Sequence, residues 1–248
     1  MTYYASVAVA HKEPNRDDFE ASLIEQPKPE VLYDWEAGIS RKSTSFNWNL
    51  NLFWMNYKDQ LVLTGKINDI GAYTRTNVPK SYRAGVEFES NWKISSTLTS
   101  SGHITFSKNQ IESFTEYIDD YDNGGQLAIE HKNTAISLSP ALTAGHTISF
   151  VPNKDWQLNF ISRYASKQYL DNTQNESRIL KAYFLNDFMA QYQLAKKQKW
   201  SAQIQLHMNN LFDVKYEPNG YTYSYLYAST ITTSNNFYPM AGRNYWLT

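Results

Sequence analysis

The chain has 248 residues, a net charge of −1 and no cysteine, with 42% hydrophobic, 19% charged and 15% aromatic residues. No apolar run approaches the roughly 20 residues of a transmembrane helix, and the lack of cysteine excludes disulfide bonds and thiolate metal sites. The near-zero net charge favours neither nucleic acid nor an acidic partner. The aromatic content is typical either of membrane-interface girdles or of stacking platforms in a binding module.

Ten β-strands are expected, because apolar and polar residues alternate along most of the chain. They are expected at residues 2–11, 31–40, 46–63, 81–93, 97–106, 141–150, 156–164, 181–194, 200–212 and 237–248. The ninth is the clearest: apolar residues occupy the even positions from Trp200 to Met208, and polar residues the odd positions from Ser201 to Asn209. About 9–11 residues is also the length with which a tilted strand crosses a bilayer.

The connections between these strands alternate in length. Short turns join the second strand to the third, the fourth to the fifth, the sixth to the seventh and the eighth to the ninth. Long polar connections are expected at 12–30, 65–80, 107–139, 165–178 and 213–236. All short turns would then lie at one end of the strands and all long loops at the other, which is typical of outer-membrane barrels. A soluble β-sandwich or jelly roll is the alternative.

Several short motifs occur in order at the expected strand ends. They are Glu13-Pro14-Asn15-Arg16, Pro29-Glu30 with Trp35-Glu36-Ala37-Gly38, Tyr57-Lys58-Asp59-Gln60-Leu61, Asn77 with Gly85-Val86-Glu87, Asn210-Leu211-Phe212-Asp213 with Tyr216, and Ala241-Gly242-Arg243-Asn244-Tyr245. Each is weak alone, but together they span nearly the whole chain. In this combination the sequence resembles the β-barrel of TonB-dependent outer-membrane receptors.

The resemblance implies an all-β antiparallel barrel of about 22 strands around a plug. Residues 1–248 would be its C-terminal portion, with the plug domain and the earlier strands absent. The chain departs from the family in lacking a terminal aromatic residue at Thr248. Residues 1–30 show no signal-peptide pattern, which predicts a mature form, a fragment or a cytosolic protein. An unpaired strand edge cannot face lipid, so a fragment is expected.

The resemblance also implies a function: import of a scarce nutrient through the outer membrane of a Gram-negative cell, driven by TonB. A ferric siderophore is the expected ligand, and outer-membrane lipid, the plug domain and TonB are the other expected partners. No cofactor, metal, nucleic acid or catalytic activity is expected, since no catalytic motif occurs. Cobalamin, haem and oligosaccharide importers, a self-contained barrel protease or lipase, and a soluble glycan-binding protein remain alternatives.

Two groups of residues are candidates for binding. The first lies on the polar face of the expected wall, where it would contact a plug or substrate, or simply form a hydrated surface: Asn47, Asn49, Asn51, Arg83, Glu87, Glu89, Arg163, Gln203, Gln205 and His207. The second lies in the long loops, where its rings would stack on a ligand or pack within the loop: Tyr117, Tyr121, Tyr221, Tyr223, Tyr225 and Tyr227. Tyrosines two positions apart face the same way in an extended segment.

An acidic segment in the loop at 107–139 contains Glu116, Asp119, Asp120 and Asp122. Clustered carboxylates bind hard cations, but the spacing of a calcium loop is not met, so a solvated acidic loop is expected. The five histidines are scattered without paired spacing, and no haem or zinc site is expected.

Overall fold

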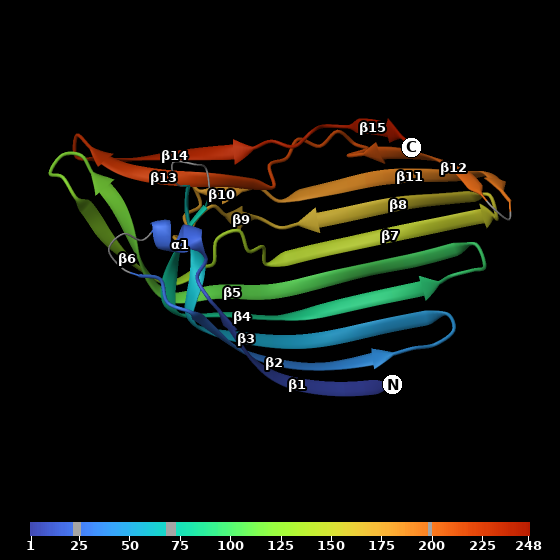
Figure 1. Cartoon of the computed structure of the whole chain (residues 1–248), viewed down its shortest axis with the longest axis horizontal. Coiled ribbons are helices and arrows are strands. Elements are labelled where there is room, and N and C mark those ends of the chain that lie inside the picture. The colour runs from blue at the N-terminus through green and yellow to red at the C-terminus, as the bar shows by residue number, and fades with distance from the viewer. Residues whose placement is uncertain (22–25, 68–72, 198–199) are drawn as a thin grey trace.

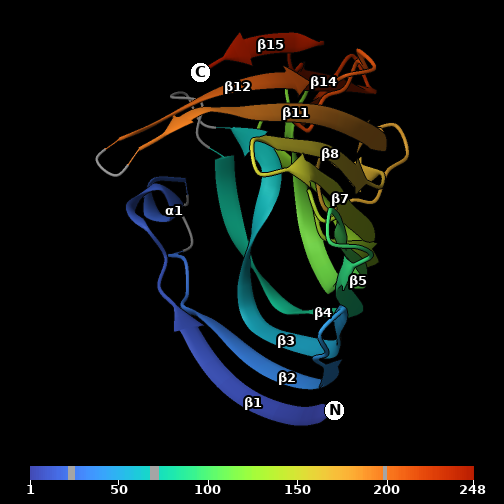
Figure 2. The same ribbon diagram turned by 90° about the vertical axis from the view of Figure 1, so that its right-hand side faces the viewer.

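The structure is a computed structural model that describes residues 1–21, 26–67, 73–197 and 200–248. Ten strands form an antiparallel wall in which each pairs with the next (Figure 1). They are β1 (Thr2–Lys12), β2 (Glu30–Arg41), β3 (Phe46–Ile67), β4 (Tyr73–Lys93), β5 (Leu98–Asp120), β7 (Leu142–Asn153), β8 (Trp156–Ala165), β11 (Tyr183–Lys196), β12 (Ser201–Asn209) and β15 (Asn244–Leu247). The wall is curved, with β1 and β15 at its two edges (Figure 2).

The remaining elements gather at one end of the wall, where the long connections lie (Figure 1). They are α1 (Arg16–Ala21), β6 (Gln126–Ala135), β9 (Gln168–Tyr169), β10 (Ile179–Leu180), β13 (Asn219–Tyr227) and β14 (Thr230–Tyr238). We call this end the loop end. None of the described helices has the length and hydrophobicity needed to span a membrane.

The strand register sorts the side chains of the wall onto two chemically different faces. One row across five strands contains Ala37, Leu52, Val86, Phe106 and Leu142. The neighbouring row, on the other face, contains Gly38, Asn51, Glu87, Thr105 and Thr143. The alternation in the sequence therefore produces one continuous apolar face and one polar face.

The two faces also differ in exposure. Leu52 and Trp54 are 52% and 51% exposed, whereas Asn51, between Leu52 and Leu50 on the same strand, is 7% exposed. Side chains crowd together on the concave side of a curved sheet and spread apart on its convex side, so the polar face is the concave one. An apolar convex face without protein cover is what a barrel wall presents to lipid.

The buried hydrophobic core lies at the loop end. Val62, Val78, Ile111 and Ile136 form a cluster in which each is at most 3% exposed, and Phe114 packs against it. These residues belong to the outer parts of β3, β4 and β5 and to the segment that follows β6. The long connections therefore fold against one another as a packed unit.

The long connections contain more regular structure than their sequence predicts, and the prediction that they are loops is wrong in part. The expected loop at 107–139 is mostly a hairpin, because β5 continues to Asp120 and β6 returns along it. The expected loop at 65–80 is shorter, because β4 begins at Tyr73. A strand outside the membrane needs no regular apolar face, so its sequence lacks the alternation that revealed the wall. Residues 22–25 and 68–72, in two of the expected loops, lie outside the described residues.

The other three expected loops also contain regular structure. Helix α1 lies within 12–30, β9 within 165–178, and β13 with most of β14 within 213–236. The expected last strand at 237–248 is wrong in its first half, since Phe237 and Tyr238 end β14 and only Asn244–Leu247 pair with β12. The other strand boundaries agree closely with the expected ones.

Candidate ligand-capture site

Two hairpins meet at their tips at the loop end. The β5–β6 hairpin and the β13–β14 hairpin join through a short parallel pairing of Tyr225 with Asp119 and Leu226 with Asp120. The backbone N–H of Tyr121 donates to the carbonyl of Leu226 at 2.9 Å. These contacts hold the tips together although the two hairpins are far apart in the chain.

The turn of the β13–β14 hairpin is fixed by a carboxylate of the other hairpin. Asp122 accepts hydrogen bonds from the backbone N–H groups of Ala228 at 2.7 Å and Ser229 at 2.6 Å. Both of these turn residues have positive φ angles, 49° and 59°, as a tight hairpin turn requires. Asp120 closes its own turn, and hydrogen bonds from the side chain and backbone of Asn123 lower the pKa of Asp120.

The loop tyrosines lie along the two hairpins that meet here, and we call them the tyrosine cluster: Tyr117, Tyr121, Tyr221, Tyr223, Tyr225 and Tyr227. The ring of Tyr221 lies farther from the tips, 6.0 Å from that of Tyr238. The ring centroids of Tyr223 and Tyr225 lie 6.5 Å apart, and those of Tyr121 and Tyr225 lie 5.8 Å apart. The four tyrosines of β13 alternate with Thr222 and Ser224, which are buried. The structure therefore places these four rings on one side of the strand, as the spacing predicts.

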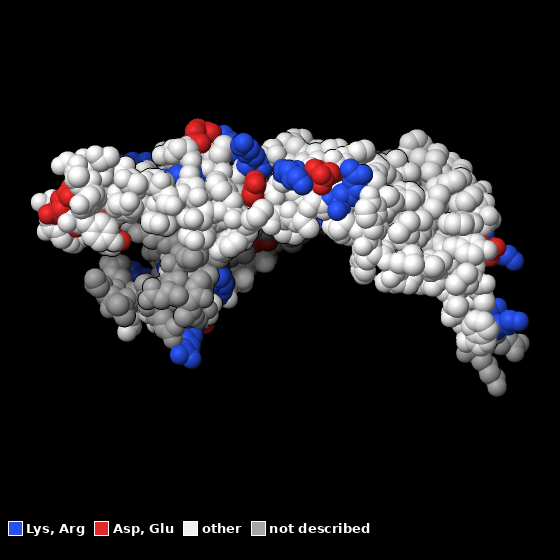
Figure 3. Space-filling model, turned by 90° about the horizontal axis from the view of Figure 1, so that it is seen from above, with Lys and Arg blue, Asp and Glu red and all other residues white. Residues whose placement is uncertain are grey.

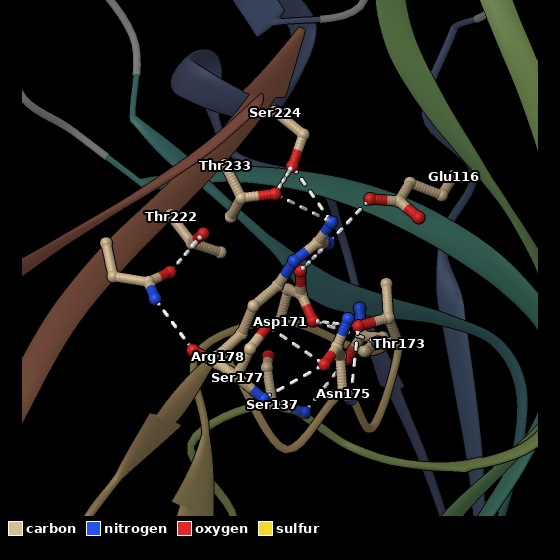
Figure 4. A network of polar contacts seen from close by, with 12 residues as sticks. Glu116, Ser137, Asp171, Thr173, Asn175, Ser177, Arg178, Thr222, Ser224 and Thr233 are labelled. Atoms are coloured by element: carbon tan, nitrogen blue, oxygen red, sulfur yellow. Dashed lines mark hydrogen bonds and ion pairs between the residues drawn. The ribbon is translucent and has the colours of Figure 1, made fainter. Parts of the chain in front are cut away.

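Behind β13, a buried arginine connects three segments of the loop end (Figure 4). The guanidinium of Arg178 donates from Nη1 to Glu116 Oε1 at 2.7 Å and to Asp171 Oδ2 at 2.6 Å, and from Nη2 to Ser224 Oγ at 2.9 Å. The side chain of Arg178 is 7% exposed. Burial alone would lower the pKa of Arg178, but the hydrogen bond to Glu116 and the charge of Asp171 outweigh it and raise this pKa. The guanidinium therefore stays charged.

The second carboxylate oxygen of Glu116 extends the network to β6. Its Oε2 lies 2.9 Å from His131 Nε2, and the imidazole stacks on Phe114 with ring centroids 5.0 Å apart. Glu116 is therefore part of a buried ion-pair network, and the expectation of a wholly solvated acidic loop is wrong for this residue. Among the described residues no group of His, Asp and Glu could hold a metal ion.

A cavity of about 340 Å³ opens beside this network, between the outer ends of β3 and β4 on one side and β5 and β13 on the other. Its lining includes Arg75, Glu116, Tyr117, Asn172, Arg178 and Tyr223. The guanidinium of Arg75 lies 3.3 Å from Asp18 of α1, so its charge is also paired. The volume is at the lower end of the range for small-molecule pockets.

The wall candidates lie on the polar, concave face, and several bond to neighbouring side chains of that face. Asn51 accepts from the Tyr4 hydroxyl at 2.9 Å, and Gln191 bridges Gln203 and Gln205 at 3.1 and 3.0 Å. The other candidates that share this face are Asn49, Arg83, Glu87, Glu89, Arg163 and His207. Asn47 lies at the turn end and accepts from the backbone N–H of Ser43 at 2.8 Å.

Comparison with known proteins identifies the fold. The family described as "TonB dependent receptor-like, beta-barrel" matches residues 1–211. The chain belongs to this family. No curated protein sequence matches the chain. The TonB-dependent receptors are outer-membrane transporters and not enzymes, so the predicted antiparallel barrel wall, the outer-membrane location and the non-enzymatic assignment are confirmed.

Solved structures show the same fold over 99% of the chain. The copper transporter OprC has a TM-score of 0.70 at 14% identity, the siderophore receptor PiuA from Acinetobacter baumannii 0.67 at 17%, and the ferric yersiniabactin uptake receptor FyuA from Yersinia pestis 0.64 at 16%. The chain covers 36%, 32% and 34% of these structures, respectively. It therefore spans about a third of the length of the receptors that it matches.

The receptor motif Asn210-Leu211-Phe212-Asp213 forms the turn that ends β12. Asn210 and Asp213 have φ angles of 50° and 55°, which are incompatible with a strand and explain why β12 stops at Asn209. The side chain of Asn210 bonds to both the N–H and the carbonyl of Val214, at 2.9 and 2.8 Å. A hydrogen bond from the Arg243 N–H, with help from Lys215, lowers the pKa of Asp213. The motif therefore ties the end of β12 to the segment before β15.

Sequence reasoning missed Arg178 and Asp171. Arg178 is 62 positions from Glu116 and 46 from Ser224. Both missed residues lie in a polar segment without periodicity, and no local pattern marks them. The tyrosine row was visible because its members repeat every second position.

Proposed function

We propose that this chain is the C-terminal part of the barrel of a TonB-dependent receptor and supplies its wall and ligand-capture loops. The whole receptor would import a scarce nutrient across the outer membrane. A plug domain would fill the lumen, and TonB would supply the energy through the receptor's N-terminal region. The plug domain and the segment that contacts TonB would belong to parts of the receptor outside this chain.

The observation that carries the proposal is the division of the molecule into two parts. A wall with a bare apolar convex face is suited to lipid, and the packed loop end places aromatic rings and polar groups where solute arrives from outside. The polar concave face would meet the plug, with Arg83, Glu87 and Arg163 among its charged groups. This arrangement suits binding and passage, since pockets for ligands combine aromatic surface with a few polar groups.

For the ligand, we propose a ferric siderophore held by the tyrosine cluster. Exposed tyrosine rings give large, rigid contact area at low entropic cost. Tyr117, Tyr121, Tyr223 and Tyr227 are 53%, 68%, 45% and 63% exposed, so their rings are accessible to a ligand.

Replacing Tyr223 and Tyr225 together with serine should weaken ligand binding by about tenfold or more, since each aromatic contact contributes roughly 0.5–1.5 kcal/mol. Uptake of radioactive iron by cells that carry the receptor measures this effect. Tyr169→Ser is the control, because it replaces a tyrosine by serine at the loop end outside the cluster. Uptake should also disappear in cells without TonB; uptake that persists there would contradict the proposed mechanism.

A further inference from the structure

The two hairpins that carry the tyrosine cluster share an unusual distribution of charge. Their outer parts, residues 109–131 and 216–242, contain no lysine and no arginine, whereas Lys132 lies nearer the base of the first hairpin, opposite Ser113. They contain seven carboxylates: Glu112, Glu116, Asp119, Asp120, Asp122, Glu130 and Glu217. Figure 3 shows acidic side chains at the end of the molecule where these hairpins lie. The rings are therefore set in an acidic surface, although the chain as a whole is nearly neutral.

The nearest buried cation does not change this balance. Arg178 is enclosed behind β13 and bonds to two carboxylates, Glu116 and Asp171. Arg75, on the cavity wall, is paired with Asp18. Both guanidinium charges are thus matched by carboxylates, and Lys80 lies 3.9 Å from Glu112. Among the described residues, Asp119, Asp120 and Asp122 at the tips take part in no ion pair, so a ligand on the rings would meet their negative potential.

Asp119 is the carboxylate best placed to act on a ligand at the rings. It lies directly opposite Tyr225 in the parallel pairing of β5 with β13. Its Oδ1 accepts a hydrogen bond from Gln126 Nε2 at 2.8 Å, which leaves its negative charge uncompensated. Asp120 and Asp122, in contrast, close the two hairpin turns.

We propose that the tyrosine cluster selects ferric complexes whose net charge is zero or positive and excludes strongly anionic ones. The inference rests on the proposed function and narrows its ligand class. Three hydroxamates each lose one proton and neutralise ferric iron, and an added ammonium makes the complex cationic. Three catecholates each lose two protons and give a triply negative complex, which the carboxylates would repel. The π faces of tyrosine attract a cation and do not attract an anion.

The test compares three ferric probes on cells that carry the receptor. They are a linear trihydroxamate with a free ammonium, the same compound with its amine acetylated, and a tris-catecholate. The ammonium complex should bind most tightly, and its affinity should fall as salt is raised, because salt screens exposed charges. The acetylated complex should bind more weakly, and the catecholate least. Binding of none of the three would overturn the ferric-siderophore proposal and this inference with it.

Charge-reversal variants test whether Asp119 is responsible for the proposed charge selection. Asp119→Lys should weaken binding of the ammonium complex by roughly tenfold. The difference in affinity between the ammonium complex and the catecholate complex should therefore become smaller. Glu112→Lys is the control, because it makes the same charge change on the same strand at an exposed carboxylate that pairs with Lys80 and lies away from the hairpin tip. Preferential binding of the catecholate, or equal effects of both variants, would overturn the charge selection while leaving iron import standing.

Discussion

Arg178→Met is expected to release the β13–β14 hairpin from the β5–β6 hairpin while the barrel wall stays folded. The substitution keeps much of the aliphatic volume but leaves the buried Asp171 and the half-buried Glu116 without their cation. Removing one partner of a buried ion pair costs about 3–5 kcal/mol, because the remaining charge is no longer compensated. Ser224, which is 5% exposed, also loses its guanidinium donor.

Hydrogen exchange over residues 219–238 measures this release. The rate should rise by roughly a hundredfold or more if the local opening energy falls by that amount. Amides of β7, β8 and β11 should be unaffected, since these strands are held by their own ladder. Lys167→Met is the control, because it breaks an exposed pair with Glu176 at the same end of the molecule.

A second variant separates the loss of the cation from misfolding. Arg178→Met combined with Glu116→Gln and Asp171→Asn also removes the two carboxylate charges that the single variant leaves without a cation. Part of the protection of residues 219–238 against hydrogen exchange should therefore return. Unchanged exchange in the single variant would show that the tip contacts of Tyr121 and Asp122 hold the hairpin without the arginine.

Leu52→Arg is expected to destabilise the wall in a bilayer by about 2–4 kcal/mol, the cost of an arginine on a lipid-facing strand near the membrane midplane. Leu52 lies between Ala37 and Val86 in the apolar row and is 52% exposed on the convex face. Its environment must therefore be lipid and not protein.

The matched control for Leu52→Arg is Asn49→Arg, which places the same side chain on the concave face of the same strand. There it would lie beside Glu89, its cross-strand neighbour. Urea unfolding in lipid vesicles should show a large loss of stability for the first variant and little for the second. Equal losses would contradict the assignment of the two faces.

The wall could be derived from the sequence because lipid and lumen impose opposite chemistry on alternate residues. Leu52, Val86 and Phe106 each occupy the apolar phase of their own strand, and the register then aligns them. The alternation of short and long connections located the two ends of the wall in the same way. The loop end obeys no such rule, since its strands are stabilised by contacts between distant segments.

Among the binding candidates, too, the sequence predicts what local spacing determines and misses what contacts between distant segments determine. Tyr221, Tyr223, Tyr225 and Tyr227 share a face as their spacing requires. Tyr117 and Tyr121 lie near them only because β13 pairs with β5, between residues more than a hundred positions apart. A local sequence pattern does not predict a pairing at that separation. Ligand contact by these rings, and plug contact by the wall residues, stay predictions.

Cysteine labelling on intact cells tests most directly whether this chain forms an outer-membrane wall with its capture loops outside. Residues 1–248 contain no native cysteine, so none has to be removed from this part before single cysteines are introduced. A membrane-impermeant maleimide should label Tyr223→Cys on intact cells. It should label Ser95→Cys, in the short turn after β4, only after the outer membrane is permeabilised, and Leu52→Cys under neither condition. Labelling of Leu52→Cys by the aqueous reagent, or of Ser95→Cys on intact cells, would contradict the account.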